Sequence, residues 1–332
     1  CRMILNNFTA VKWKNKIFKN HSTQEFEDLA LEVFRYQLIH CKVYSEYANA
    51  LGKINPSKLS EIPFLPISFY KSRKIISDTF NTHECVFKSS GTQGERSTHY
   101  VADTDIYKKS FDSTYRSFIG NPEDQIIIGL LPNYVEQGDS SLVYMVNHLI
   151  ETSKNNGSQF FLSELEQLQE VVTNSNLSGK QLVVIGVAYS LLDLCDLGVN
   201  LSNAIVIETG GMKGRRKELS KENLHSKLIK ELNINRLYSE YGMTEMLSQA
   251  YCTKDFQFQG PPWMRVLIRD LYDPLSIIGD NKRGGINIID LANVFGCSFI
   301  ATEDTGIKIG DKFQLMGRIE KSDLRGCNLL VE

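Results

Sequence analysis

Short apolar runs alternate with amphipathic stretches along the middle of the chain. The run QIIIGLL, at residues 125–131, is rich in Ile and Leu, and three later runs have the same character. Runs of this length and composition are typical of strands that are buried on both faces of a sheet. Together with the helical stretches between them, they predict a layered α/β fold with a largely parallel sheet. The predicted strands are 125–131, 181–186, 203–209 and 234–241, and the predicted helices are 104–119, 140–153, 162–173, 188–197 and 219–232.

The first eighty residues follow a helical pattern and then an irregular one. Apolar residues recur with helical spacing after Ser22, which is a suitable N-cap because Glu25, three residues on, completes a capping box. We expect one helix from there to Gly52. The segment IPFLPISFYKS that follows contains two prolines, which predicts an extended connection. The apolar stripe of the helix would consist of Phe26, Leu29, Val33, Tyr36 and Leu38.

The pattern changes after Pro262. Four β-like segments follow one another there, with turns and no helical stretch between them: MRVLIRD, GGINIID, CSFIATED and DKFQLMGRIE. We therefore predict a β-rich subdomain attached to the α/β core. The predicted division is a helical and extended N-terminal region at 1–84, the α/β core at 85–262 and the β-rich subdomain at 263–332.

The composition of the chain restricts which partners the protein is expected to bind and in which cellular compartment it is expected to lie. The chain has 332 residues, of which 37 are basic and 39 acidic, and its net charge of −2 favours neither a nucleic acid nor a membrane surface as partner. No apolar run reaches the roughly 18 residues that a membrane span needs, and the N-terminal residues lack the apolar region of a signal peptide. Seven cysteines without a C-x-x-C pair fit a reduced interior better than disulfides or a metal site. We expect a cytoplasmic protein.

A loop rich in glycine and hydroxyl groups separates two strand-like runs between Phe87 and Val101. Glycines let backbone N–H groups face a ligand, and the hydroxyls and the nearby Arg96 suit a phosphate. The loop does not match the Walker A pattern. Taken alone, it is either a hairpin turn or a phosphate-binding loop. Its residues are Ser89, Ser90, Gly91, Thr92, Gln93 and Gly94.

A second short pattern raises hydrolysis as an alternative reaction. Gly138-Asp139-Ser140 matches the nucleophile signature of one class of hydrolases, which would also need an activating histidine. Only His148 and His225 follow it, and neither lies in an Asp-x-x-His context. An N-cap at Asp139 or Ser140 accounts for the pattern better. The six histidines show no metal-site spacing.

Five segments, in order, resemble motifs of the adenylate-forming superfamily, which includes acyl-CoA synthetases and luciferases. The loop at 89–94 resembles its SGTTG phosphate-binding motif, and YSEYGMTE at 238–245 resembles its aromatic-Gly-x-Thr-Glu motif. More narrowly, LPNYVEQGDSSLVYMV and SDLRGCNLL resemble the acyl-protein synthetase branch, the LuxE family. The resemblance implies the large N-terminal domain of that fold. The other three segments are ETGGMKGRR (208–216), ATEDTG (301–306) and GRIEKSDLRG (317–326), the last of which is similar to the hinge motif.

The resemblance implies a site for ATP and Mg²⁺. Glu245 would bind the metal ion, Thr244 would contact the α-phosphate, and the loop at 89–94 would hold the β- and γ-phosphates. Asp304 would accept hydrogen bonds from the ribose, and Arg318 would reach the ribose or the phosphates. Without the resemblance, Thr244 is equally an N-cap, Asp304 a turn residue and Arg318 an ordinary exposed side chain. The residues implied beside the adenine are Thr209, Gly210, Gly211, Tyr241 and Gly242.

The implied activity is ATP-dependent activation of a carboxylic acid, with a fatty acid as the expected substrate, followed by acyl transfer to a thiol. The LuxE family carries the acyl group on a cysteine near the C-terminus, and Cys327 is the residue here that qualifies. The alternative is a buried, inert Cys327 in a closing strand. The implied partner is an acyl-accepting protein, either acyl-CoA reductase-like or an acyl carrier protein.

One departure from the superfamily keeps a second function open. Fourteen residues follow Arg318, so we expect the small C-terminal domain that follows the hinge in other members, and its lysine, to be absent. Lys213, Arg215 and Arg216 are candidates for supplying the missing charge. The alternative function is therefore a non-catalytic or acyltransferase descendant that serves as an acyl- or nucleotide-binding module.

Overall fold

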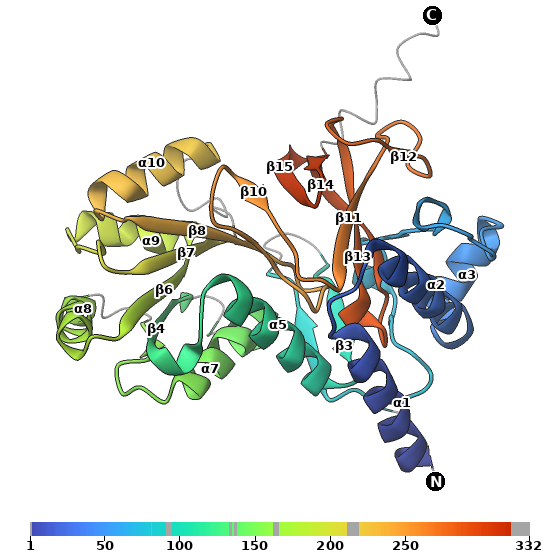
Figure 1. The fold of residues 1–332 in the computed structure, drawn as a ribbon, viewed down its shortest axis with the longest axis horizontal. Coiled ribbons are helices and arrows are strands. Elements are labelled where there is room, and N and C mark those ends of the chain that lie inside the picture. The colour runs from blue at the N-terminus through green and yellow to red at the C-terminus, as the bar shows by residue number, and fades with distance from the viewer. Residues whose placement is uncertain are drawn as a thin grey trace, which may run out of the picture. The chain divides into compact units, whose positions relative to one another are not determined.

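The protein divides into two compact units, each built from more than one segment of the chain (Figure 1). The structure is a computed structural model, and it describes residues 2–80, 82–90, 95–132, 135, 138–161, 166–210 and 219–319. Unit 1 comprises residues 1–110, 243–248 and 256–332, and unit 2 comprises residues 111–242 and 249–255.

The described part of unit 2 contains a sheet of six strands in the order β5-β4-β6-β7-β8-β9. The first five strands are parallel to one another, and β9 is antiparallel to β8. Every residue of β4 and β7 is buried, as expected for strands covered on both faces. The strands are β4 (Gln125–Leu130), β5 (Gln159–Phe160), β6 (Gln181–Val187), β7 (Ile205–Thr209), β8 (Arg236–Tyr241) and β9 (Ala250–Cys252).

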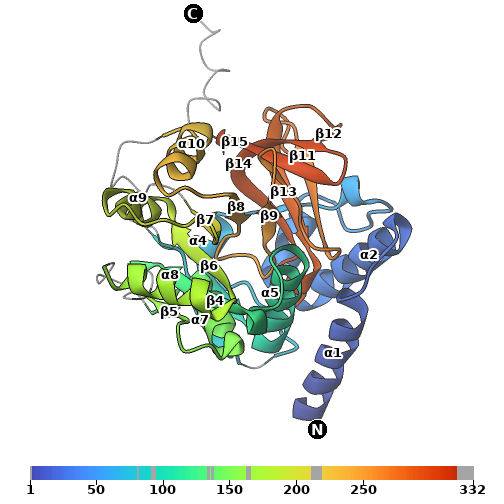
Figure 2. The same ribbon diagram turned by 60° about the vertical axis from the view of Figure 1, so that its left-hand side comes forward.

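Helices cover both faces of this sheet (Figure 2). Three of them, α8 (Glu166–Ser178), α9 (Ala188–Asp196) and α10 (Lys221–Glu231), share one apolar cluster with residues of β4 and β6, among them Ile128 and Val184. On the opposite face, a Cβ at Gly129 would contact Val146 of α7 (Ser141–Ser153), so this glycine lets helix and sheet approach closely. The predicted strands and helices between residues 104 and 241 are thus confirmed in the described residues. Helix α8 continues to Ser178, beyond the predicted end at residue 173, and residues 162–165 of that prediction lie outside the described residues. A 3-10 turn, η2 (Pro122–Asp124), precedes β4, and α5 (Thr104–Phe118) runs from unit 1 into unit 2.

Unit 1 contains, in its described residues, a sheet with the strand order β10-β15-β14-β13-β11-β12, and β1 pairs in parallel with β14. The other pairs are antiparallel. A separate hairpin joins β2 to β3. The β-rich segment predicted after Pro262 is confirmed. The strands are β1 (Leu65–Pro66), β2 (Cys85–Lys88), β3 (Thr98–Val101), β10 (Gln257–Phe258), β11 (Met264–Arg269), β12 (Ile277–Ile278), β13 (Gly284–Asp290), β14 (Phe299–Ile309) and β15 (Lys312–Arg318), with η3 (Leu291–Asn293) after β13.

The N-terminal helices of unit 1 differ from the prediction at one point. The capping box at Ser22 and Glu25 is present, but the helix that it starts ends at His40 instead of continuing to Gly52. Cys41 adopts an extended conformation, and the redirected chain buries Tyr44 of the next helix completely. The connection predicted as extended contains β1 and one helical turn. The helical segments are α1 (Arg2–Ile17), α2 (Thr23–His40), α3 (Lys42–Ala50), η1 (Leu59–Glu61) and α4 (Phe69–Ser72).

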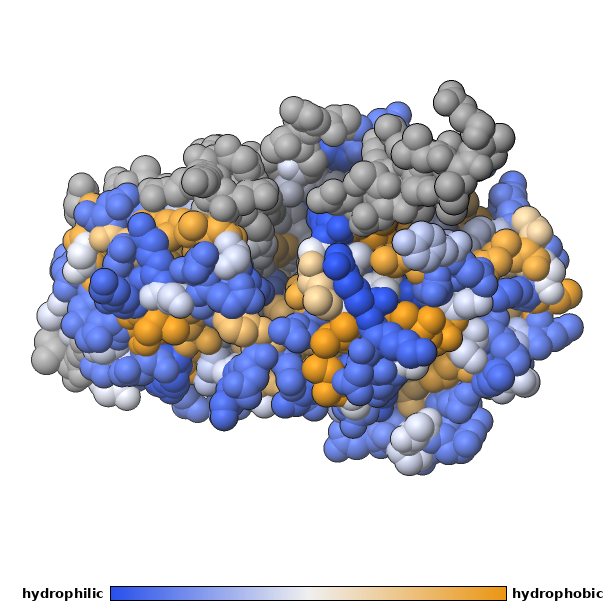
Figure 3. Space-filling model, turned by 90° about the horizontal axis from the view of Figure 1, so that it is seen from above, coloured by the Kyte–Doolittle hydropathy of each residue, from blue (hydrophilic) through white to orange (hydrophobic). Residues whose placement is uncertain are grey.

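None of the helices in the described ranges is long and apolar enough to cross a membrane. On the face drawn in Figure 3, the coloured residues are mostly hydrophilic, with small apolar groups between them.

Candidate functional site

The segment that carries Thr244 and Glu245 belongs to unit 1 and is held there by side chains. Nδ1 of His99 lies 2.7 Å from the carbonyl oxygen of Thr244, and Nδ2 of Asn293 donates to the carbonyl oxygen of Glu245 at 2.8 Å. Both side chains are buried. Sequence analysis did not select His99 or Asn293, because neither lies in one of the recognised motifs.

The same segment is fixed a few residues later by Asp290, the last residue of β13. Its carboxylate accepts hydrogen bonds from the backbone N–H groups of Leu247 and Ser248, at 2.8 and 3.0 Å, and from the Ser248 hydroxyl at 2.6 Å. Burial raises the pKa of Asp290, although these hydrogen bonds oppose the shift. The Thr244–Ser248 turn is therefore anchored at both of its ends.

Glu245 is only 5% exposed. Burial raises the pKa of its carboxyl, while a hydrogen bond with the Ser97 side chain and the positive charge of Lys71 oppose the shift. A buried carboxylate of this kind gains from a nearby cation. No group of three or more His, Cys, Asp or Glu in the described residues could hold a metal ion. As a single carboxylate, Glu245 itself is a suitable ligand for Mg²⁺, which commonly binds one or two carboxylates and completes its shell with phosphates and water.

The predicted phosphate-binding loop starts at the β2–β3 hairpin. Ser97 N–H donates to Ser89 Oγ at 2.9 Å, and Ser89 N–H donates to the Ser97 carbonyl at 3.0 Å. The guanidinium of Arg96 donates to the Ser89 carbonyl. Since Ser97 also contacts the Glu245 carboxylate, the base of this hairpin lies beside Glu245. Ser90 follows β2, whereas Gly91, Thr92, Gln93 and Gly94 lie outside the described residues.

Asp304 and Arg318 lie opposite each other on β14 and β15. Arg318 Nε is 3.6 Å from Asp304 Oδ1, and the side chains are 81% and 18% exposed respectively. Asp304 lies inside a strand, so its interpretation as a turn residue is wrong. The neighbouring Glu303 is close enough to raise the pKa of Glu245 further. Ser89, Glu245 and the Asp304–Arg318 pair thus all belong to unit 1. Cys327 lies outside the described residues.

In unit 2, the residues expected beside the adenine lie at the carboxyl ends of two adjacent parallel strands. Thr209 ends β7 and Tyr241 ends β8, and each strand is followed by an exposed glycine, Gly210 and Gly242. Gly210 has φ = 70°, which favours glycine. In open α/β sheets, ligands bind outside the carboxyl ends of the strands. Gly211 and the basic residues Lys213, Arg215 and Arg216 lie outside the described residues.

Two buried acids at the same strand ends were not selected from the sequence. Glu240 accepts a hydrogen bond from the Thr209 hydroxyl, and burial, with a contribution from Glu208, raises its pKa to about 7. Glu208 points to the opposite face, toward His225 and Lys221 at 3.7 and 3.5 Å. Burial acts against its ionisation, but these two partners outweigh burial and lower its pKa.

The interpretation of Ser140 as a helix cap is confirmed. Its hydroxyl accepts a hydrogen bond from Val143 N–H at the start of α7. His148 packs edge-on against Phe111, with ring centroids 5.2 Å apart. These contacts are those of a helix cap and of a packed aromatic ring.

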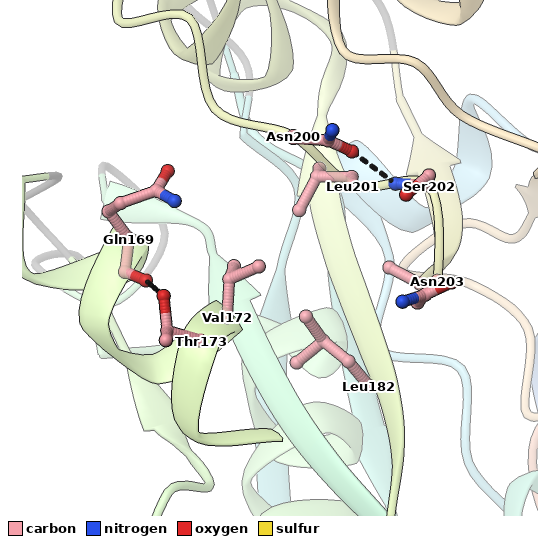
Figure 4. A pocket seen from close by; sticks show the side chains of 9 residues that line it. Gln169, Val172, Thr173, Leu182, Asn200, Leu201, Ser202 and Asn203 are labelled. Atoms are coloured by element: carbon pink, nitrogen blue, oxygen red, sulfur yellow. Dashed lines mark hydrogen bonds between the residues drawn. The ribbon is translucent and has the colours of Figure 1, made fainter. Parts of the chain in front are cut away.

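A cavity of about 270 Å³ in unit 2 contains none of the predicted site residues (Figure 4). It lies between α8 and residues 200–204, the segment before β7. Leu182, the second residue of β6, also lines it. The cavity is thus near the end of the sheet at which the parallel strands begin. Thr209 and Tyr241 lie at the opposite end, where β7 and β8 finish. Its polar lining comes mainly from Gln169, Thr173, Asn200, Ser202 and Asn203.

Comparison with solved structures identifies the fold. The 2-hydroxyisobutyryl-CoA ligase in complex with 2-HIB-AMP and CoA matches with a TM-score of 0.64 at 11% identity, over 91% of this chain and 70% of that chain. ATP-bound MatB from Rhodopseudomonas palustris matches with a TM-score of 0.52 at 14% identity, over 70% of this chain and 47% of that chain. At these identities the matches show the fold alone. The expected fold, that of the large domain of adenylate-forming enzymes, is confirmed.

Sequence comparisons identify the family. The long-chain-fatty-acid–luciferin-component ligase of Photorhabdus luminescens is 35% identical over 71 residues, which are 21% of this chain and 60% of that protein. The match thus spans less than two thirds of that relative. Residues 14–332 match the family described as "Acyl-protein synthetase, LuxE". The chain therefore belongs to the acyl-protein synthetase, LuxE family.

Proposed function

We propose that this protein activates a carboxylic acid with ATP and Mg²⁺ and then transfers the acyl group to a thiol. In the first step the carboxylate attacks the α-phosphorus, so that RCOO⁻ and ATP give RCO–AMP and pyrophosphate. In the second step a thiolate attacks the acyl carbon and AMP leaves, giving a thioester. The observation that carries the proposal is the position of Glu245, buried beside the base of the β2–β3 hairpin in a chain of this family.

The residues of unit 1 would supply binding and charge for the first step. Bound Mg²⁺ would neutralise phosphate charge as it develops. Glu245 would hold the metal ion directly or through water, and Thr244 would orient the α-phosphate. Asp304 would accept hydrogen bonds from the ribose, with Arg318 opposite it. In unit 2, Thr209–Gly211, Tyr241 and Gly242 would face the adenine.

A fatty acid is the substrate that we propose to test first, because the Photorhabdus relative is named as a long-chain-fatty-acid ligase. The proposed carrier of the acyl group is Cys327. Four of the five described cysteines are poor alternatives. Burial raises the pKa of Cys41 and Cys195 to about 11 and raises that of Cys85 and Cys297 as well. A thiol with a raised pKa supplies little thiolate at neutral pH.

The final acceptor proposed is an acyl-CoA reductase-like protein or an acyl carrier protein, in the cytoplasm. These proposals come from the family resemblance and from the composition of the chain.

The test is acid-dependent pyrophosphate release from ATP, measured over a panel of fatty and aryl acids with and without Mg²⁺. Release that requires both the metal ion and a particular acid would support the proposal. ATP binding without turnover on any acid would contradict it and favour an acyl- or nucleotide-binding module.

A further inference from the structure

The backbone carbonyls of Thr244 and Glu245 are each held by a buried polar side chain. His99 Nδ1 lies 2.7 Å from the Thr244 oxygen, and Asn293 Nδ2 lies 2.8 Å from the Glu245 oxygen. The two side chains also meet, with His99 Nε2 at 3.2 Å from Asn293 Oδ1. They form a continuous chain of contacts along one side of the turn.

The orientation of the Asn293 amide follows from its other partner. Its Nδ2 group donates both to Glu245 and to the carbonyl oxygen of Cys297, at 2.9 Å. Because carbonyl oxygens only accept, the amide nitrogen must face them and Oδ1 must face His99. Asn293 is thereby locked in place behind the imidazole ring.

The role of each nitrogen of His99 can then be assigned. Two acceptor oxygens face the ring, the Thr244 carbonyl at Nδ1 and Asn293 Oδ1 at Nε2, and a neutral imidazole carries one proton. Burial lowers the pKa of His99 to about 4, although both oxygens favour the charged ring, so the ring is neutral at physiological pH. The contact of Nδ1 with Thr244 is the shorter, at 2.7 Å against 3.2 Å, so the proton is assigned to Nδ1. The bond to Thr244 is therefore the one that the neutral ring donates.

His99 lies on the strand that leads away from the predicted phosphate-binding loop. Two residues before it, Ser97 contacts the Glu245 side chain and pairs with Ser89 at the base of the loop. The segment from Ser97 to His99 thus contacts the Thr244–Glu245 turn twice, through the Glu245 carboxylate and through the Thr244 backbone.

We propose that His99, with Asn293 behind it, is a positioning residue that fixes Thr244 and Glu245 relative to β3 and to Ser89 and Ser97 at the base of the β2–β3 hairpin. The catalytic meaning of this role rests on the proposed function, whereas the positioning itself does not. His99 contacts the backbone of the turn, and its effect on chemistry would pass through the placement of Glu245 and Thr244.

The packing around His99 restricts what could replace it. A Cβ at Gly296 would contact Asn293 Oδ1 and lie 3.3 Å from His99 Nε2, and Tyr70 packs edge-on against the ring at 5.5 Å. The adjoining cavity has a volume of about 10 Å³, which is at most one water molecule. Solvent therefore cannot take over the role of a lost side chain.

Two substitutions of similar size test the roles of the two ring nitrogens of His99 separately. The amide nitrogen of Asn is bonded to the γ carbon, as Nδ1 is in histidine, so His99→Asn preserves the donor to Thr244. The amide nitrogen of Gln lies one atom farther out, near the position of Nε2, so His99→Gln preserves contact with Asn293 and loses the bond to Thr244. Tyr44→Phe is the control, because it removes another buried hydrogen bond of unit 1, the one to the Pro63 carbonyl.

The experiment measures pyrophosphate release and the hydrogen exchange of amides in residues 243–249 for all four proteins. We expect His99→Gln to lower kcat about tenfold or more, with a smaller change in KM for ATP, and to speed exchange in the segment. His99→Asn should stay within about threefold of wild type in kcat, and Tyr44→Phe should change neither readout. The proposal would be overturned if His99→Asn and His99→Gln changed kcat and amide exchange equally. It would also be overturned if His99→Gln changed neither. If the wild type releases no pyrophosphate with any acid, the proposed function fails, and the exchange comparison still decides whether His99 positions the turn.

Discussion

The hydroxyl of Thr209 donates a hydrogen bond to the carboxylate of Glu240, the residue paired with it on the neighbouring parallel strand. This single bond does not offset the burial of the acid, whose pKa is raised from 4.5 to about 7. The folded state therefore favours the protonated form. The stability that this group contributes is fully present below about pH 4.5 and is lost as the pH rises through 7.

Glu240→Gln should therefore flatten the dependence of stability on pH. Between pH 5 and pH 8, the wild-type protein should lose about 2–3 kcal/mol more unfolding free energy than the variant, because each unit of pKa shift corresponds to about 1.4 kcal/mol. Urea denaturation at several pH values measures the difference. Glu170→Gln, at an exposed position of α8, is the matched control and should retain the wild-type slope. Parallel curves for wild type and Glu240→Gln would show that Glu240 is ionised throughout this range.

Glu245→Gln should lower kcat for pyrophosphate release far more than it raises KM for ATP. The substitution keeps the size of the side chain and its contact with Ser97 but removes the charge proposed to hold Mg²⁺ in the transition state. A fall of at least about 100-fold is expected from the loss of one such electrostatic contact. Initial rates over a range of Mg²⁺ concentrations test this. Glu303→Gln, which removes an exposed neighbouring acid, should have a much smaller effect, and a similar effect of the two would argue against a specific role of Glu245.

Asp304→Ala should act mainly on nucleotide affinity. The two charge-assisted hydrogen bonds proposed from the ribose are worth roughly 1.5–3 kcal/mol each, so KM or Kd for ATP should rise by at least about tenfold. Calorimetric titration with ATP and with 2′-deoxy-ATP gives a direct check, since the deoxy nucleotide should lose less affinity on substitution than ATP does. Unchanged ATP binding by a folded Asp304→Ala protein would remove Asp304 from the site.

Cys327 should become acylated when the protein is incubated with ATP and a labelled acid. The label should be sensitive to hydroxylamine, map to Cys327 by mass spectrometry, and disappear in Cys327→Ser while acid-dependent pyrophosphate release continues. Cys85→Ser, at a half-buried thiol whose pKa burial raises, is the control and should keep the label. Undiminished thioester labelling in Cys327→Ser would exclude Cys327 as the carrier.

The features that were predictable from the sequence depend on neighbours in the chain. Ser22 and Glu25 form their capping box because both partners lie within one helical turn. Strands β4, β6 and β7 were recognisable since each is largely a continuous apolar run, whereas β5 and β9 are very short and were not predicted. The break at Cys41 was not, because the spacing of apolar residues continues through it and burial of Tyr44 decides the change of direction.

The residues of the candidate site also fall into two groups, those that a local sequence pattern marks and those that only the fold brings together. Thr244, Glu245 and Asp304 could be selected because short motifs contain them, although their roles remain predictions. His99 contacts Thr244, 145 residues away, and Asn293, 194 residues away, and no local pattern marks such a pair. Glu240 was passed over because its burial is created by strand pairing and by the helices that cover the sheet.

Gln37 of α2 joins two parts of unit 1 that are far apart in the sequence. Its buried amide donates to the carbonyl oxygens of Asn293 and Val294, and its Oε1 accepts from Ser298 N–H, 261 residues later. At a synthesis rate of about 5–20 residues per second, roughly 10 to 50 s pass between the translation of α2 and that of its partners. During that interval the apolar face of α2 and its buried amide have no native cover. Newly made chains of this protein should therefore depend on cellular chaperones while unit 1 waits for its last strands.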